Sequence, residues 1–135
     1  MLPGLLGYNL RRAQLAVFGD FHRTVGELEL SPAQFTVLHL LRHNPALRSG
    51  EVAEALGIKR ANFVALLEGL ERGGLVERRR DARDGRAATL HLLPEGEDLV
   101  RRAERLVRAH ERRIVRRLEQ GGAEHLLRLL EQLRD

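Results

Sequence analysis

The stretch "EVAEALGIKRANFVALLEGLERGGLVERR", from Glu51 to Arg79, decides the fold. Its opening segment predicts a short helix that begins near Ser49 and ends at Gly57, because glycine readily adopts the left-handed backbone conformation that stops a helix. Apolar residues recur at helical spacing from about Arg60 to Arg72, which predicts a second helix. Two helices joined by a tight glycine turn indicate a helix-turn-helix.

A charge-dense segment follows, "VERRRDARDGRAATLHL", in which two short apolar runs flank a polar loop. Leu75 and Val76 on one side, and Leu90 and Leu92 on the other, predict two short strands. Pro94 cannot continue a strand and suits the first position of a helix. We therefore expect a mainly α fold in which a small β-hairpin wing follows the helix-turn-helix.

Upstream, the tetrapeptide "SPAQ" has the form of a helix start. Ser31 can cap the helix, Pro32 fits its first turn, and Gln34 can reach back as in a capping box. Pro45 ends this helix, because it drives the preceding residue out of helical geometry. The expected buried face consists of Phe35, Leu38 and Leu41.

Long amphipathic helices are expected at both ends of the chain. Apolar residues recur at spacings of three and four from Leu6 to Leu28, and again from Pro94 to about Leu118. After two glycines a last short helix carries five leucines. This is more apolar surface than single surface helices bury, so we expect it to face a partner subunit. The opposite face of the Pro94 helix, with Glu104 and Arg108 four apart, is interpreted as solvated and partly ion-paired.

The composition favours a polyanionic partner and excludes thiol chemistry. The formal net charge is +4, from 23 Lys and Arg against 19 Asp and Glu, and Lys59 is the only lysine. Arginine suits bidentate phosphate and guanine contacts, although ion pairing within the protein also explains part of the excess. There is no cysteine, which excludes disulfides and thiolate metal sites. The N-terminal segment lacks the order of a signal peptide and no apolar run could span a membrane, so a cytoplasmic protein is expected.

Three segments, in order, resemble the MarR family of bacterial transcriptional regulators. The first is the quoted helix-turn-helix with the start of its wing. The second is "DARDGR", Asp81 to Arg86, which is similar to the family's wing signature Asp-x-Arg-Asp-x-Arg. The third is "LLPEG", ending at Gly96, which resembles the family's entry into its dimerisation helix. The resemblance covers the whole chain.

This resemblance implies a winged helix-turn-helix with N- and C-terminal dimerisation helices. Residues 1–135 would form a single MarR-type domain, with dimerisation helices at about 1–30 and 94–135 and a DNA-binding lobe at about 31–93. The protein would be a homodimer on a pseudo-palindromic site in double-stranded DNA. Its recognition helix would enter the major groove and its wing the minor groove. Most members are repressors released by a small-molecule effector, and no motif here identifies that effector.

Carried onto this sequence, the resemblance implies a set of DNA contacts. The recognition helix begins without the family's usual Ser or Thr cap, and Phe63 on it is interpreted as a core residue. Asp81, Asp84 and Gly85 are expected to shape the wing, the aspartates by pairing with wing arginines. For each single arginine a surface ion pair, for example with a nearby glutamate, is the competing interpretation. The predicted DNA contacts are Lys59, Arg60, Asn62, Arg72, Arg79, Arg80, Arg83 and Arg86.

Other functions are less well supported by the residues. His39 and His43 are four apart on one helix, a spacing that can chelate a metal, and His110 could approach them. Scattered surface histidines are the stronger interpretation, so we expect no metal and no cofactor. No phosphate-binding loop, catalytic triad or carboxylate pair indicates an enzyme. The alternatives left open are a helical protein-interaction module with weakened DNA reading, and a metal-responsive regulator.

Overall fold

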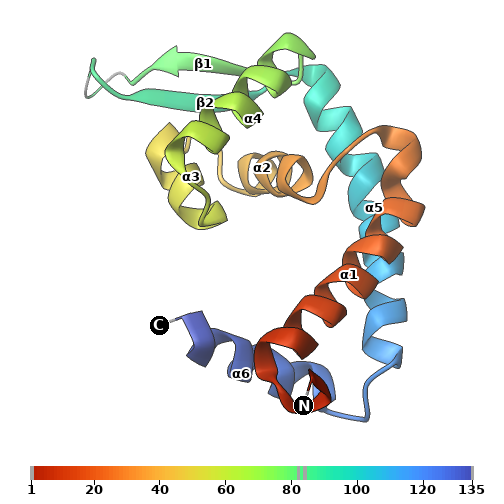
Figure 1. The fold of residues 1–135 in the computed structure, drawn as a ribbon. Coiled ribbons are helices and arrows are strands. Elements are labelled where there is room, and N and C mark those ends of the chain that lie inside the picture. The colour runs from red at the N-terminus through yellow and green to blue at the C-terminus, as the bar shows by residue number, and fades with distance from the viewer. Residues whose placement is uncertain (1, 82, 84, 135) are drawn as a thin grey trace. The chain divides into compact units, whose positions relative to one another are not determined.

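The computed structural model describes residues 2–81, 83 and 85–134 (Figure 1). The chain divides into two compact units. The first, called here the central unit, comprises residues 25–104; the second, the terminal unit, comprises the residues before 25 and after 104. No helix in the described residues is long and apolar enough to cross a membrane.

Three helices build the first part of the central unit: α2 (Pro32–His43), α3 (Ser49–Leu56) and α4 (Arg60–Arg72). The predicted capping box is present on α2. The Ser31 hydroxyl accepts a hydrogen bond from the Gln34 backbone N–H at 3.1 Å, and the Gln34 side-chain oxygen accepts one from the Ser31 N–H at 2.9 Å. Gly57 ends α3 with φ of 65°, as predicted. Lys59 precedes α4 without a side-chain capping bond, which agrees with the expected missing cap.

The wing is an antiparallel hairpin of β1 (Val76–Arg80) and β2 (Ala88–Leu92). The segment Leu47–Arg48 pairs with the other edge of β2, a contact that the sequence did not indicate. The Leu90 N–H donates to the Leu47 carbonyl at 2.9 Å, and Arg48 forms an isolated bridge with Thr89. These bonds tie the wing to the residue before α3, so the hairpin is held by the helix-turn-helix as well as by its own strands.

The core of the central unit lies among α2, α3, α4, the hairpin and the start of α5 (Pro94–Arg116). Phe63 is buried, as predicted. Phe35 is only partly buried, contrary to expectation, and Val37 is fully buried on the same helix. Each fully buried leucine or valine contributes about 1.5–3 kcal/mol by removal from water. The most completely buried large side chains are Val25, Val37, Leu38, Val52, Leu67, Leu70, Val76, Leu90 and Val100.

The terminal unit contains most of α1 (Leu6–Val25), the end of α5, and α6 (Gly122–Arg134). The first helix is shorter than the apolar pattern predicts, because a 3₁₀ turn at Gly26–Leu28 replaces its last turn. The fifth helix ends at Arg116 rather than near Leu118. There the N–H of Leu118 bonds to the carbonyl of Val115, three residues back, which tightens the chain into a turn.

A polar contact links α1 and α5 inside the terminal unit. The His110 Nδ1 lies 2.5 Å from one Asp20 carboxylate oxygen, and an Arg113 N–H donates to the same oxygen at 3.1 Å. Hydrogen bonds from Arg113 and then from His110 lower the pKa of Asp20 from 3.8 to about 2. The ring of Phe21 meets the His110 ring edge-on at 5.7 Å between centroids. Within the terminal unit, a ring nitrogen of His110 thus pairs with Asp20.

Candidate nucleic-acid interface

A groove of about 750 Å³ opens between α3, the start of α4 and the wing. Arg60 from α4 and Arg78 and Arg86 from the hairpin line it together, with Val64 contributing an apolar side chain. The N-terminus of a helix presents backbone N–H groups with a partial positive charge, which favours an anion there. The fold therefore joins a helix terminus and wing arginines around one concave, cationic surface.

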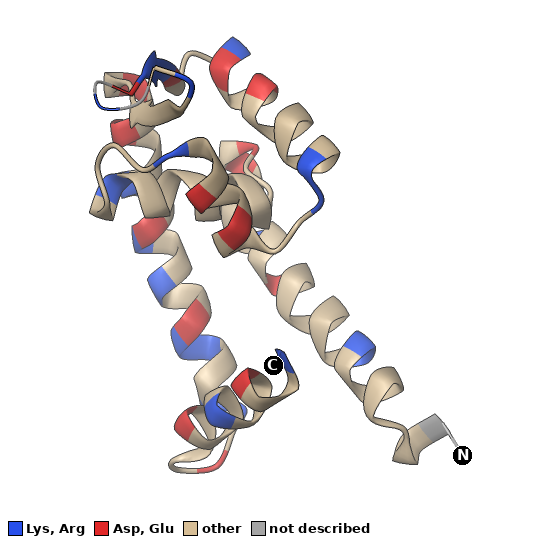
Figure 2. Cartoon of the chain, turned by 90° about the vertical axis from the view of Figure 1, so that its left-hand side faces the viewer, with Lys and Arg blue, Asp and Glu red and all other residues tan. Residues whose placement is uncertain are grey.

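All eight predicted DNA contacts are exposed. Figure 2 shows how Lys and Arg gather along the hairpin, where basic residues follow one another on β1. Asn62 and Arg60 lie in the first turn of α4 and are exposed, whereas Phe63 is buried. Val64 is 41% exposed on the same helix and offers an apolar contact. The helix can thus present a mixed polar and apolar surface, although it has few polar groups beyond its first turn.

Two wing arginines form ion pairs within the protein. Arg78 Nη2 lies 2.8 Å from a Glu71 carboxylate oxygen, and Arg79 Nε donates to Glu77 at 2.6 Å. The competing interpretation, a surface ion pair, thus holds for Arg79 in this structure. Both arginine side chains remain about half exposed, and such pairs contribute at most about 1 kcal/mol. A phosphate could therefore replace the glutamate at little cost.

Asp81 is buried at the base of the wing loop and holds two groups. One carboxylate oxygen accepts a hydrogen bond from the Arg83 backbone N–H at 2.9 Å, and the other accepts one from Arg48 Nε at 2.9 Å. The Arg83 N–H, together with Arg48, lowers the pKa of Asp81 despite burial. Its ion pair is to Arg48, next to α3, and the wing contributes the Arg83 N–H; pairing with a wing guanidinium stays a prediction. Arg48 lies 33 residues before Asp81, so no local sequence pattern indicated this contact.

The other two predicted wing-shaping residues are Asp84 and Gly85. Asp84 lies outside the described residues. Gly85 is exposed in the turn, and its expected positive φ stays a prediction. Across the base of the loop, the Asp81 N–H donates to the Ala87 carbonyl at 3.0 Å. This bond closes the hairpin just before the loop.

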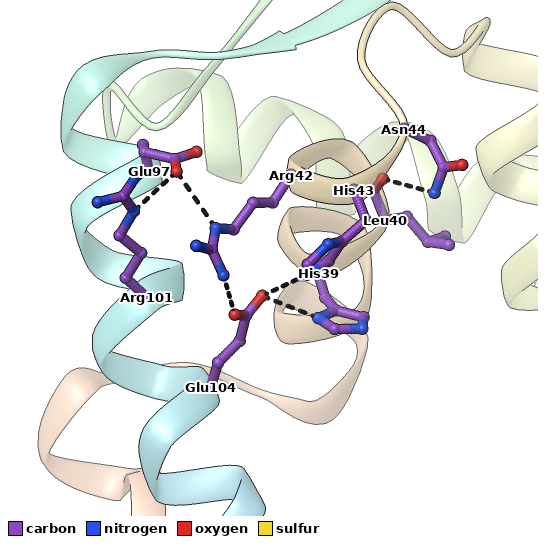
Figure 3. A network of polar contacts seen from close by, with 8 residues as sticks. All are labelled: His39, Leu40, Arg42, His43, Asn44, Glu97, Arg101 and Glu104. Atoms are coloured by element: carbon purple, nitrogen blue, oxygen red, sulfur yellow. Dashed lines mark hydrogen bonds and ion pairs between the residues drawn. The ribbon is translucent and has the colours of Figure 1, made fainter.

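The two candidate metal-binding histidines, His39 and His43, converge on one carboxylate, Glu104 of α5 (Figure 3). Glu104 was expected on a solvated face with Arg108, and that expectation was wrong: its side chain is buried. A long helix with glutamates and arginines at many positions gives no indication of which one turns inward. His110 is not part of this group among the described residues.

A helix-turn-helix whose second helix shares a cationic groove with a two-stranded wing defines a winged helix-turn-helix DNA-binding protein. A protein-family model described as "MarR family" matches residues 28–87. The HTH-type transcriptional repressor Rv2887 of Mycobacterium tuberculosis (strain ATCC 25618 / H37Rv) is 30% identical over 128 residues, which cover 95% of this chain and 92% of that repressor. The chain belongs to the MarR family, as a DNA-binding transcriptional repressor and not an enzyme.

Solved structures agree over nearly the full length. The transcriptional repressor CouR bound to a 23-mer DNA duplex is 44% identical, covers 99% of this chain and 95% of its own, and superposes with a TM-score of 0.92. CouR bound to p-coumaroyl-CoA is 43% identical, with coverages of 98% and 94% and a TM-score of 0.89. The PcaV regulator from Streptomyces coelicolor, in complex with its natural ligand, is 27% identical, with coverages of 100% and 95% and a TM-score of 0.93. The sequence-based prediction of family and fold is confirmed.

Proposed function

We propose that this repressor acts as a cytoplasmic homodimer on a pseudo-palindromic operator and is released by an acyl-CoA effector. The observation that carries the DNA-binding mode is the groove that Arg60, Arg78 and Arg86 line together. At this protein groove the start of α4 lies beside the hairpin. A helix fits the major groove of DNA, and the hairpin can follow the adjacent DNA backbone. Each subunit would read one half-site.

The wing supplies the second contact of each half-site. A guanidinium in the minor groove gains from the negative potential of a narrow groove, and Arg83 and Arg86 lie in the loop where a wing tip would enter. Asp81 fixes the base of that loop through Arg48 and the Arg83 N–H. The remaining proposed contacts would bind phosphates or base edges: Lys59, Arg60, Asn62, Arg72, Arg79 and Arg80.

Dimerisation is supported by the apolar side chains of the terminal unit. Leu6 of α1 is 72% exposed, and Leu127 and Leu133 of α6 are 61% and 57% exposed. Soluble monomers rarely leave so many large apolar side chains exposed to water in one region. A second copy of the same surface would cover them, and it would place two wings and two recognition helices on one duplex.

The effector class is supported by similarity to CouR, which was solved with p-coumaroyl-CoA. A thioester of this kind combines an aromatic acyl group with a polyanionic nucleotide. An arginine-rich protein can bind such a molecule through charge-assisted hydrogen bonds to its phosphates. Titrating p-coumaroyl-CoA into the DNA complex should release the duplex, whereas free CoA and free p-coumarate should release much less. Equal release by free CoA would contradict an acyl-CoA effector.

The DNA-binding mode is tested by replacing both wing arginines. Fluorescence anisotropy with DNA from upstream of the protein's own gene would compare the wild type with R83A/R86A across a range of salt concentrations. We expect affinity to fall about 10- to 100-fold. The slope of log K against log salt should become shallower by about 0.9 for each phosphate that is no longer neutralised.

A matched control removes the same charge from α5. Arg108 and Arg112 are both exposed there, so R108A/R112A should bind DNA nearly as the wild type does. Wild-type affinity in R83A/R86A, or an equal loss in the control, would rule out a wing contact.

A further inference from the structure

The histidine cluster, which we define as His39, His43 and Glu104, is not needed by the DNA-binding mode proposed above. His39 and His43 lie one turn apart on α2, and Glu104 reaches them from α5 (Figure 3). His39 Nδ1 is 2.9 Å and His43 Nε2 is 3.2 Å from the same oxygen of Glu104. The three ligand atoms all lie within 4.8 Å of one another.

The two distances from the histidines to Glu104 are close to the spacing of ligands around a tetrahedral metal ion. Zinc binds imidazole nitrogen and carboxylate oxygen at about 2.0–2.2 Å, which places neighbouring ligands about 3.3 Å apart. The cluster therefore needs only small side-chain rotations to surround an ion with three ligands. Water would occupy the fourth position, because both histidine side chains are about half exposed and leave a path to solvent.

The surroundings of Glu104 keep it charged and oriented. Its side chain is only 5% exposed, and His39, His43 and Arg42 all lie against its carboxylate. Arg42 binds the second carboxylate oxygen and also contacts Glu97 at 3.2 Å. Outer partners of this kind fix the direction of a metal-binding carboxylate.

The ring of His39 is also oriented by its neighbours. Phe35 stacks on it with centroids 5.4 Å apart and an interplanar angle of 20°. A carboxylate can only accept, so each histidine contact with Glu104 requires the tautomer that carries its proton on the nitrogen facing it. When a cation binds, each ring would keep its proton on the other nitrogen and offer a lone pair to the metal.

We propose that His39, His43 and Glu104 bind one zinc-like divalent cation and that the ion fastens α2 to α5. Two imidazoles and one carboxylate suit zinc and its transition-metal neighbours, whereas magnesium and calcium prefer oxygen ligands throughout. Through the ion, the first helix of the DNA-binding lobe would be joined to the long helix that leaves it. This site shares no residue with the proposed wing contacts.

The test uses the full chain without an affinity tag, stripped of metal by a chelator. Zinc would be titrated in competition with a chromophoric zinc chelator, and Co²⁺ would report four-coordinate geometry by its visible absorption. We expect one site per chain in the wild type, and an affinity at least about tenfold lower in H39A, H43A and E104Q. Zinc should also raise the melting temperature of the wild type but not that of H43A.

His125 on α6 provides the matched control, because it is an exposed histidine outside the cluster. H125A should bind zinc as the wild type does. If Glu104→Gln does not fold, the two histidine variants decide the question, since both side chains are half exposed. Failure of the wild type to hold zinc against the chelator would overturn the proposal. Equal losses in H125A and H43A would also overturn it, because they indicate adventitious surface binding.

Discussion

The central and terminal units contain similar kinds of apolar residue but bury them to different extents. In the central unit, leucines and valines from three helices, the hairpin and α5 are removed from water almost completely. Among the described residues of the terminal unit, Phe21 is the only hydrophobic side chain that is buried. All exposed large hydrophobic side chains in the described chain other than Val64 belong to the terminal unit.

This difference indicates two sources of stability. The central unit closes a core within one chain, so its stability should not depend on protein concentration. The terminal unit leaves its apolar surface for the second subunit that we propose, so its stability should rise with concentration, as expected where folding and association are linked. The terminal unit buries little apolar surface within one chain. Hydrogen bonds from His110 and Arg113 to Asp20 hold its helices α1 and α5 together.

Placing charge on α6 should have the largest effect on assembly and DNA binding. It tests whether the terminal unit needs a second subunit to cover its apolar surface. We expect the double variant L127D/L133D to be monomeric at micromolar concentration, because two carboxylates would be buried at the proposed interface. Operator affinity should fall by at least about 100-fold, since the two half-sites would no longer be bound together. Light scattering after size exclusion measures the first effect and anisotropy the second. R128A, on the same helix, should remain dimeric; a dimeric double variant would contradict the proposed interface.

Gly96 tests how tightly the central unit closes on itself. A Cβ at this position would lie 2.1 Å from the Leu75 carbonyl oxygen, so Gly96→Ala must push α5 away from the start of the hairpin. We expect a loss of about 1–3 kcal/mol in unfolding free energy, independent of protein concentration. Denaturant titration at two concentrations would measure it. Gly69→Ala is the control, because no atom lies within 4 Å of its added Cβ and alanine favours a helix; it should be neutral or stabilising.

Acid should destabilise the terminal unit through Asp20. The pKa of this carboxyl in the folded chain is about 2, below its ordinary value of 3.8. A depressed pKa means that ionised Asp20 stabilises the fold above pH 3.8, and that this contribution is lost as the pH falls from there to about 2. The melting temperature of the wild type should therefore fall across this window, and Asp20→Asn should lack part of that fall. Asp98→Asn, at an exposed position on α5, should keep the wild-type profile.

The smallest expected effect concerns the start of the recognition helix in the central unit. Lys59 makes no side-chain capping bond, so Lys59→Ser should add about 1 kcal/mol to the unfolding free energy. Lys59→Ala removes the same charge without adding a capping oxygen and should not gain stability. Both variants should bind DNA somewhat more weakly, if Lys59 contacts phosphate as proposed. A serine variant no more stable than the alanine variant would show that the cap is satisfied in another way.

Local signals in the sequence predicted most elements of the central unit. The capping box at Ser31, the left-handed glycine at position 57 and the proline that begins α5 act over a few residues, so their effects can be inferred from neighbours. The same applies to the hairpin, whose two strands are confirmed. Lys and Arg in the recognition helix and wing were expected at the surface and are exposed there.

Contacts between distant segments could not be inferred in this way. The partner of Asp81 is Arg48, and the carboxylate that joins His39 and His43 comes from Glu104, on a helix with many charged residues. Gly96 belonged to a recognised motif, but its physical reason, the close approach of the Leu75 carbonyl, appears only in the packed structure.

The sequence by itself determined the order of the helices, the wing and the family, because caps, turns and apolar periodicity depend on residues a few positions apart. Only the tertiary structure decided which glutamate is buried, which arginine holds the wing, and that His110 pairs with Asp20. Those choices depend on where two distant segments meet, and many charged side chains of one chain are equivalent until packing removes some of them from water.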